Sequence, residues 1–177
     1  ASGDITIGTQ AKVEITETTS NATICGPTTI NATFSRIQYN VNYGVCSDTQ
    51  WGSIALNSGS AITTTSSTTL DYGTQVILVA TPNTGYHIEG WYKDNACSQS
   101  LNNGTNNTYT INSLTEAANV YVKFAENTYT VTITNDGNGT TTLNGVQTVG
   151  QVTGIDINAT PNEDYGFVNW DIIEGTG

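Results

Sequence analysis

The sequence predicts an all-β fold, or at most a β-rich α+β fold, made of small modules in tandem. Short runs of β-branched and aromatic residues recur along the chain, and clusters of Gly, Asn, Asp and Pro separate them. No window of helical length has apolar residues at helical spacing, and only residues 114–118 are a candidate for a short helical turn. Two phrases also occur twice, which indicates a tandem repeat.

The first repeated phrase runs from Ala-Thr-Pro-Asn to a tryptophan. It begins at Ala80 and ends at Trp91, and it returns between Ala159 and Trp170 with the same internal spacing. The second phrase is a tyrosine at a fixed interval after a phenylalanine, found at Phe34 and Tyr39 and again at Phe124 and Tyr129. Because both landmarks keep their order, the chain contains one whole copy of a unit and parts of two others.

The opening strand of the unit is predicted at residues 38–43, and its later copy at 128–133. The later copy alternates, with Tyr129, Val131 and Ile133 on one face and three threonines on the other, as expected of a half-buried strand. A Gly-rich turn follows the opening strand in both copies, and the later turn reads Asn-Asp-Gly-Asn-Gly.

Two further strands complete the first half of the unit. The second strand carries Ile54 and Leu56, and the third is predicted at 74–80, with 152–159 as its later copy. Pro82 follows the third strand and ends it, because proline lacks the amide N–H that a ladder needs.

The second half of the unit holds a fourth strand at 86–92 and two closing strands at 109–111 and 120–124. A module this small buries little without large aromatic side chains, each of which contributes roughly 2 kcal/mol when buried. We therefore expect core aromatic anchors at Tyr86, Trp91, Phe124, Tyr165 and Trp170. A binding role for either tryptophan is the alternative.

Charge and composition exclude several classes of partner. The net charge is -11 with four basic residues, so clustered Lys and Arg for nucleic acid or for an anionic membrane surface are lacking. No apolar run approaches the ~20 residues that span a bilayer. A Thr- and Asn-rich chain instead suits an extracellular β protein of the cell surface.

The three cysteines predict one disulfide. Cys46 and Cys97 both fall in the middle copy, after its first and fourth strands, and are the predicted pair. Cys25 is then buried and free, or joined to another chain; three unpaired cysteines are the alternative. With a single histidine, His87, and no Cys-x-x-Cys motif, we expect no metal site.

Catalysis and cofactors have no supporting motif in the sequence. Scattered acids such as Glu89, Asp94, Glu163 and Asp164 are expected to be solvated surface, so no catalytic or cofactor-binding residue is predicted. The Asn-Asp-Gly-Asn-Gly segment resembles part of a calcium loop but lacks its closing Glu, which favours a hairpin turn. Possible glycosylation sequons occur at Asn21, Asn31, Asn103, Asn106, Asn138 and Asn158.

These phrases together resemble the bacterial internalin B-repeat, including its divergent and Listeria–Bacteroides forms. The resemblance rests on Tyr-x-Val-x-Ile at 129–133, on the phrases at 80–91 and 159–170, and on the closing Val-Tyr-Val-Lys-Phe at 120–124. It implies a small β-grasp-like module that occurs in arrays on bacterial surface proteins, as stalk or adhesive segments rather than enzymes. The chain departs from the pattern in an insertion at 58–71 and in its three cysteines. It also departs in its phase, which is the point within the repeat at which the sequence starts and stops.

The phase of the repeat predicts three regions. Residues 1–36 correspond to the C-terminal half of a module, 37–126 to a complete module, and 127–177 to the N-terminal half of another. The two halves are complementary, and unpaired strand edges attract other chains. A head-to-tail contact between copies joins them and propagates as an open fibre.

The leading functional hypothesis is a non-enzymatic structural subunit or segment of an extracellular bacterial filament or stalk, joined by strand complementation. Its partners are other copies of itself, or neighbouring repeats of the same long chain. The alternative is an adhesive repeat fragment of a larger surface protein, whose loops at 58–71 and 95–107 bind a host or glycan ligand. No nucleic acid, membrane insertion or cofactor is expected.

Overall fold

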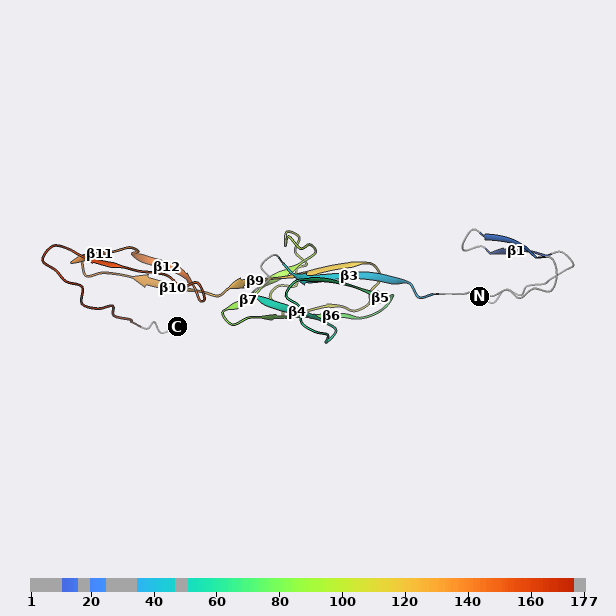
Figure 1. Cartoon of the computed structure of the whole chain (residues 1–177), viewed down its shortest axis with the longest axis horizontal. Helices are drawn as coiled ribbons and strands as arrows, with labels where there is room; N and C mark the ends of the chain where they lie inside the picture. The colour runs from blue at the N-terminus through green and yellow to red at the C-terminus, as the bar shows by residue number, and fades with distance from the viewer. Residues whose placement is uncertain (1–10, 16–19, 25–34, 47–50, 174–177) are drawn as a thin grey trace. The chain divides into compact units, whose positions relative to one another are not determined.

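The computed structural model describes residues 11–15, 20–24, 35–46 and 51–173 (Figure 1). All regular elements among these residues are β-strands, which confirms the all-β class. The chain divides into two compact units, residues 1–36 and 37–177. The β-grasp likeness and the predicted boundary between residues 126 and 127 stay predictions.

The first unit contains one described hairpin. Strand β1 (Ala11–Ile15) pairs antiparallel with β2 (Ser20–Ile24), and Ala11 lies opposite Ile24. Asn21 belongs to β2, whereas Cys25 and Asn31 lie outside the described residues.

A four-stranded sheet forms one layer of the middle module. Its order is β5-β3-β9-β7, with β3 (Gln38–Val45), β5 (Thr65–Asp71), β7 (Tyr86–Tyr92) and β9 (Ala118–Glu126). The pair β3–β9 is parallel, with Val41 opposite Ala118, and the other pairs are antiparallel. The opening and closing strands of the module therefore lie side by side at the centre of the sheet.

A three-stranded antiparallel sheet forms the second layer (Figure 1). Its order is β4-β6-β8, with β4 (Gly52–Leu56), β6 (Val76–Pro82) and β8 (Thr108–Ile111). The sheet ends at Pro82 on β6, as the missing N–H of proline predicts.

The core lies between these two sheets. Alternate residues of β9 point inward, so that Val120, Val122 and Phe124 are buried while the residues between them are partly exposed. The buried cluster draws on both layers and consists of Val41, Val45, Ile54, Val76, Leu78, Ala80, Ile88, Trp91, Leu114, Val120, Val122 and Phe124.

The C-terminal region repeats the strand pairings of the first half of the middle module. Strand β10 (Thr128–Ile133) pairs with β12 (Gly145–Gly150), as β3 pairs with β5. Strand β11 (Gly139–Thr141) pairs with β13 (Ala159–Pro161), as β4 pairs with β6. We call residues 127–173, which contain these four strands, the C-terminal half-module.

Three expectations about elements were wrong. The segment 58–71 is not simply an insertion, because its second half is β5, an edge strand whose threonines gave no apolar alternation. Residues 152–158 form turns and irregular backbone rather than a strand; they include Gly154 with φ of 63°, and regular pairing begins at Ala159. The candidate helical turn at 114–118 does not form, because this segment is irregular up to residue 117 and β9 begins at Ala118.

Candidate functional site

Two strand edges that are paired in the middle module are open in the C-terminal half-module. In the middle module β3 lies between β5 and β9, and β6 lies between β4 and β8. Their counterparts β10 and β13 are paired on one side only, with β12 and β11, within the part of the chain that the structure describes. The open edges are therefore the ones that β9 and β8 cover in the middle module.

Matched residues of the two modules differ sharply in burial. Val41 is 0 % exposed and its counterpart Val131 is 40 % exposed. Trp91 is 1 % exposed, and its indole N–H donates to the carbonyl of Asn106 at 2.7 Å. Trp170, at the same place in the repeat, is 40 % exposed.

The prediction that Tyr165 and Trp170 are core anchors is therefore wrong for the described chain. Tyr165 is 57 % exposed, and the ring nearest to Trp170 is that of Phe167, itself half exposed. Trp91 and Phe124 are buried, and Tyr86 is partly buried against Trp51. The difference follows from the secondary structure: the first set lies on β7 and β9, within a complete two-layer module, whereas residues 162–173 form no described strand.

Exposed apolar side chains concentrate on the C-terminal half-module. Eleven of the fourteen large hydrophobic residues that are exposed in the described chain lie there. They are Tyr129, Val131, Val146, Val152, Ile155, Tyr165, Phe167, Val168, Trp170, Ile172 and Ile173. A concentration of this kind makes the C-terminal half-module the candidate interaction surface of the described chain.

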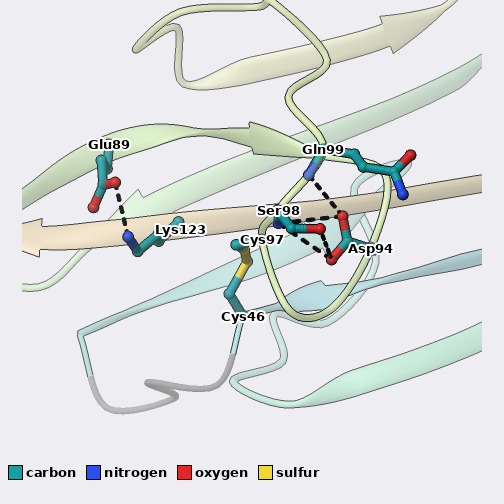
Figure 2. Close-up of a disulfide and its surroundings, with 7 residues drawn as sticks. All are labelled: Cys46, Glu89, Asp94, Cys97, Ser98, Gln99 and Lys123. Carbon is teal, nitrogen blue, oxygen red and sulfur yellow. Dashed lines mark hydrogen bonds and ion pairs between the residues drawn. A yellow bond between two sulfur atoms is a disulfide. The ribbon is translucent and has the colours of Figure 1, made fainter.

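The disulfide joins Cys46, after the end of β3, to Cys97 in the loop that follows β7 (Figure 2). The two Cα atoms are 6.2 Å apart, within the range that a disulfide spans. These are the two cysteines that the sequence predicted as a pair. The bond ties the loop after β7 to the end of β3, one of the two inner strands of the larger sheet.

Asp94 organises the loop that carries Cys97 (Figure 2). Its carboxylate accepts hydrogen bonds from the backbone amides of Ser98 and Gln99, at 3.2 and 2.8 Å. Partial desolvation opposes ionisation, but these hydrogen bonds outweigh it and lower the pKa of Asp94. The turn lets Cys97 adopt a φ of 54°, which is uncommon outside glycine.

A second arrangement of hydrogen bonds connects the middle module to the C-terminal half-module. The carbonyl of Gly85, in the turn between β6 and β7, accepts the amide proton of Asn127 at 2.8 Å, and the carbonyl of Asn127 accepts that of Gln151. The Glu126 carboxylate accepts the amide protons of Val152 and Thr153. We call the contact made by residues 85, 126–127 and 151–153 the joint.

The hydrogen bonds of the joint favour the ionised form of the Glu126 carboxylate. Hydrogen bonds from Thr153 and Val152 lower the pKa of Glu126 and outweigh the partial desolvation that would raise it. The sequence did not predict the joint, because its residues carry no motif. The available signal was the glycine at Gly85, where the later copy has Asp164.

The comparison with protein families identifies these modules. The model of the divergent InlB B-repeat domain matches residues 53–128 and 129–176, which is most of the chain. The chain belongs to this family. Repeats of this family are typical of bacterial surface proteins, and the family is one of repeat domains rather than enzymes. No curated protein and no solved structure shows a significant match to the chain.

Three acids of this InlB B-repeat chain, Glu89, Asp94 and Asp136, have local structural partners. Glu89 forms an ion pair with Lys123, with 2.8 Å between Oε1 and Nζ, and the Asp94 carboxylate binds backbone amides of its own loop (Figure 2). Asp136 accepts the amide proton of Asn138 at 2.9 Å, and this hydrogen bond lowers the pKa of Asp136. The Asn-Asp-Gly-Asn-Gly segment therefore has the local bonds of a turn.

The described residues contain neither a candidate metal cluster nor a helix that could span a membrane. No group of three His, Cys, Asp or Glu side chains there is placed to hold a metal ion. The described part contains no helix long and apolar enough to cross a membrane. His87 instead contacts Asn127, with its Nδ1 2.9 Å from the side-chain oxygen.

Among the sequons of the B-repeats, Asn106, Asn138 and Asn158 are exposed. Asn103 is partly buried, and its side-chain amide donates to the carbonyl of Thr108 at 2.9 Å. A glycan on Asn103 would compete with that hydrogen bond. Glycosylation at all six sequons stays a prediction.

Proposed function

We propose that this chain is a non-enzymatic structural segment of an extracellular bacterial surface filament or stalk, in which neighbouring copies join head to tail by β-strand complementation. One observation carries the proposal. The half-module opens the edges of β10 and β13 at the places where β9 and β8 complete the middle module.

The proposed donor is residues 28–34 of the next copy, which lie outside the described residues and are argued from sequence alone. The sequence there alternates Ile30, Ala32 and Phe34 with polar residues, as β9 alternates Val120, Val122 and Phe124. When Phe34 is aligned with Phe124, the residues Ile30 and Ala32 align with Val120 and Val122. The segment therefore has the same alternation of apolar and polar residues as strand β9.

The register of the donor follows from the middle module. There β9 lies parallel to β3, with Val120 opposite Tyr43. The same register places Ile30 of the donor opposite Ile133 of β10, and it brings Phe34 towards the exposed apolar residues. Main-chain hydrogen bonds would supply affinity, and the alternating side chains would supply specificity.

Self-association tests the proposal. We expect purified chain to form oligomers whose mass increases with concentration in sedimentation velocity, and to form fibres in electron micrographs. A synthetic peptide of residues 26–36 should cap the open edge and shorten the fibres, whereas a scrambled peptide should not. Phe34→Ser should weaken association, while the neighbouring Thr33→Ser serves as the matched control.

A chain that stays monomeric at every concentration contradicts the filament. The intact mass of native material separates a free subunit from a segment of a longer array, in which the complementing strands come from the adjoining repeat.

The second candidate function is adhesion through loops, and the disulfide-held loop after β7 favours it. A hollow of about 380 Å³ lies near this loop and is lined by residues such as Lys93, Leu101, Tyr109 and Glu116. The other loop considered, 58–71, keeps only its first part as loop, because Thr65–Asp71 is β5. Shortening residues 98–106 should abolish binding to host cells or glycans if the loop is adhesive, and should leave fibres intact.

A further inference from the structure

The chain contains three Asn-Gly dipeptides, at 103–104, 138–139 and 144–145, and all three lie among the described residues. An asparagine in front of a glycine is prone to lose its side-chain amide without an enzyme. The backbone nitrogen of the glycine can reach the side-chain carbon of the asparagine, and no Cβ obstructs the approach. Because the three dipeptides are identical, their environments in the folded chain decide which of them reacts first.

Asn144 is placed for this reaction. It is exposed and precedes β12, in the connection from β11. The amide N–H of Gly145 donates to the side-chain oxygen of Asn144 at 2.9 Å, which holds the backbone nitrogen beside the side-chain carboxamide. Gly145 has φ of 79° and no atom within 4 Å of the place where its Cβ would be. The reacting groups are therefore in contact, with room around them for a ring to close.

The side-chain nitrogen of Asn144 can also depart. In the described chain, the hydrogen bonds of Asn144 are made by its side-chain oxygen and by its backbone carbonyl, which accepts a proton from the side-chain amide of Gln147 at 3.1 Å. The side-chain nitrogen takes no part in these bonds. No protein hydrogen bond of this nitrogen therefore has to break when it leaves.

The side chains of the other two asparagines are held by neighbours. Asn103 is partly buried, and its side-chain nitrogen donates to the carbonyl of Thr108 at 2.9 Å. The side-chain nitrogen of Asn138 donates to the Asp136 carboxylate at 3.1 Å. Gly139 is crowded as well, since a Cβ on it would lie 2.7 Å from a backbone oxygen of the neighbouring strand β13. Each of these sites has to break such contacts before a ring can close.

We propose that Asn144 is a site of spontaneous deamidation. Hydroxide removes the amide proton of Gly145, and the nitrogen attacks Cγ of Asn144. The new N–C bond closes a succinimide ring, while the side-chain nitrogen takes a proton from water and leaves as ammonia. Water then adds to one of the two ring carbonyls and opens the ring, which gives aspartate or isoaspartate. Either product adds one negative charge, and isoaspartate also lengthens the backbone by one atom.

The modified residue stands at the start of a strand pair. β12 pairs with β10 from Gly145 onward, and Gly145 is opposite Ile133, a buried residue of the C-terminal half-module. An additional backbone atom just before this pair should loosen its end, because the register depends on the number of backbone atoms. In the middle module the corresponding residue is Thr65, which precedes β5 residue Ser66 and has no amide to lose. At this place in the repeat, the reaction is therefore confined to the C-terminal half-module.

Ageing of the full chain at mildly alkaline pH tests the inference, with peptide mapping by mass spectrometry as the readout. Asn144 should be converted about tenfold faster or more than Asn103 or Asn138, because prior contact between reacting groups lowers the barrier. In denaturant the three dipeptides lose their environments and should react at comparable rates. Asn144→Gln is the matched variant, because it keeps the amide and the charge but requires a larger ring. It should stop conversion at this position and keep the amide exchange of β12 constant during ageing.

The outcomes separate the effect of the fold from that of the sequence. A preference for Asn144 that is present in the folded chain and disappears in denaturant supports the inference. Equal rates in the folded chain, or faster conversion of Asn103 or Asn138, overturn it. A preference that persists in denaturant overturns the role given to the fold. None of these results depends on whether the chain associates with other copies.

Discussion

The middle module and the C-terminal half-module share strand pairings and differ in burial. In both, the first strand pairs with the third, and the second strand pairs with the fourth, which ends in proline. Yet thirteen of the fourteen buried apolar residues of the described chain lie in the middle module, and Ile133 is the exception. The first half of the repeat thus specifies its pairings, and the second half supplies the cover that makes a core.

The tryptophans give the strongest test of this contrast. Trp91→Ala should lower the free energy of unfolding by about 3–5 kcal/mol, because it empties a closed site in the core. Trp170→Ala, at the same place in the repeat, should cost less than about 1 kcal/mol in the isolated chain, since the ring is already exposed. Urea unfolding followed by circular dichroism measures both. Equal losses would mean that the half-module has a core of its own.

Removal of the disulfide should come next in size. Cys46→Ala with Cys97→Ala opens a loop of 51 residues, which should lower the free energy of unfolding by roughly 2–4 kcal/mol. The effect should be confined to the middle module, so hydrogen exchange of the amides in β10 and β12 should not change. Cys25→Ser is the matched control, and an equal loss from it would assign Cys25 to the pair instead.

A smaller effect, a gain in the free energy of unfolding, is expected at the residue that corresponds to Ile54. The counterpart of Ile54 in the pairing of β11 with β13 is Thr141, whose hydroxyl is buried without a hydrogen-bond partner among the described residues. Thr141→Val should raise the free energy of unfolding of the half-module by about 1 kcal/mol, because an unpaired buried hydroxyl is costly. The neighbouring, exposed Thr140→Val should be close to neutral. A loss in the first variant would show that water or another group satisfies the hydroxyl.

The smallest expected effect concerns pH at the joint. The pKa of Glu126 is lower in the folded chain than its ordinary value, so its stabilising effect is present at neutral pH and is lost as the pH falls through the folded pKa. Glu126→Gln should therefore flatten the acid side of the melting curve against pH. Glu163→Gln is the control; if both variants keep the wild-type slope, the Glu126 hydrogen bonds do not stabilise the joint.

Most strands of the middle module could be predicted from alternation and turn residues alone. The strands β3, β6, β7, β9 and β10 fall close to the predicted ranges. β5 was missed because an edge strand of Thr and Ser buries only part of Leu70 and carries no apolar period. The segment 152–158 was predicted as a strand because Val152, Ile155 and Ile157 resemble a buried run, yet no described strand pairs with it.

The candidate interface was predictable in part. The phase of the repeat predicted that half-modules occur, but the exposure of Trp170 and Tyr165 required the structure, because a repeated phrase suggests a repeated environment. The joint required coordinates as well. Gly85 has no side chain to mark it, and only the position of Val152 shows why a glycine is needed there.

The parallel pairing of β3 with β9 has a mechanical consequence. The chain enters the middle module at the start of β3 and leaves it at the end of β9, and these points are at opposite ends of a parallel pair. Tension along the chain therefore loads the hydrogen bonds between Val41–Val45 and Ala118–Val122 in shear, all at once, rather than opening them one after another. The Cys46–Cys97 bond also withholds the 51 residues it spans from extension. We therefore expect this module to resist pulling along the chain, and we expect the disulfide to limit how far the module lengthens when it unfolds.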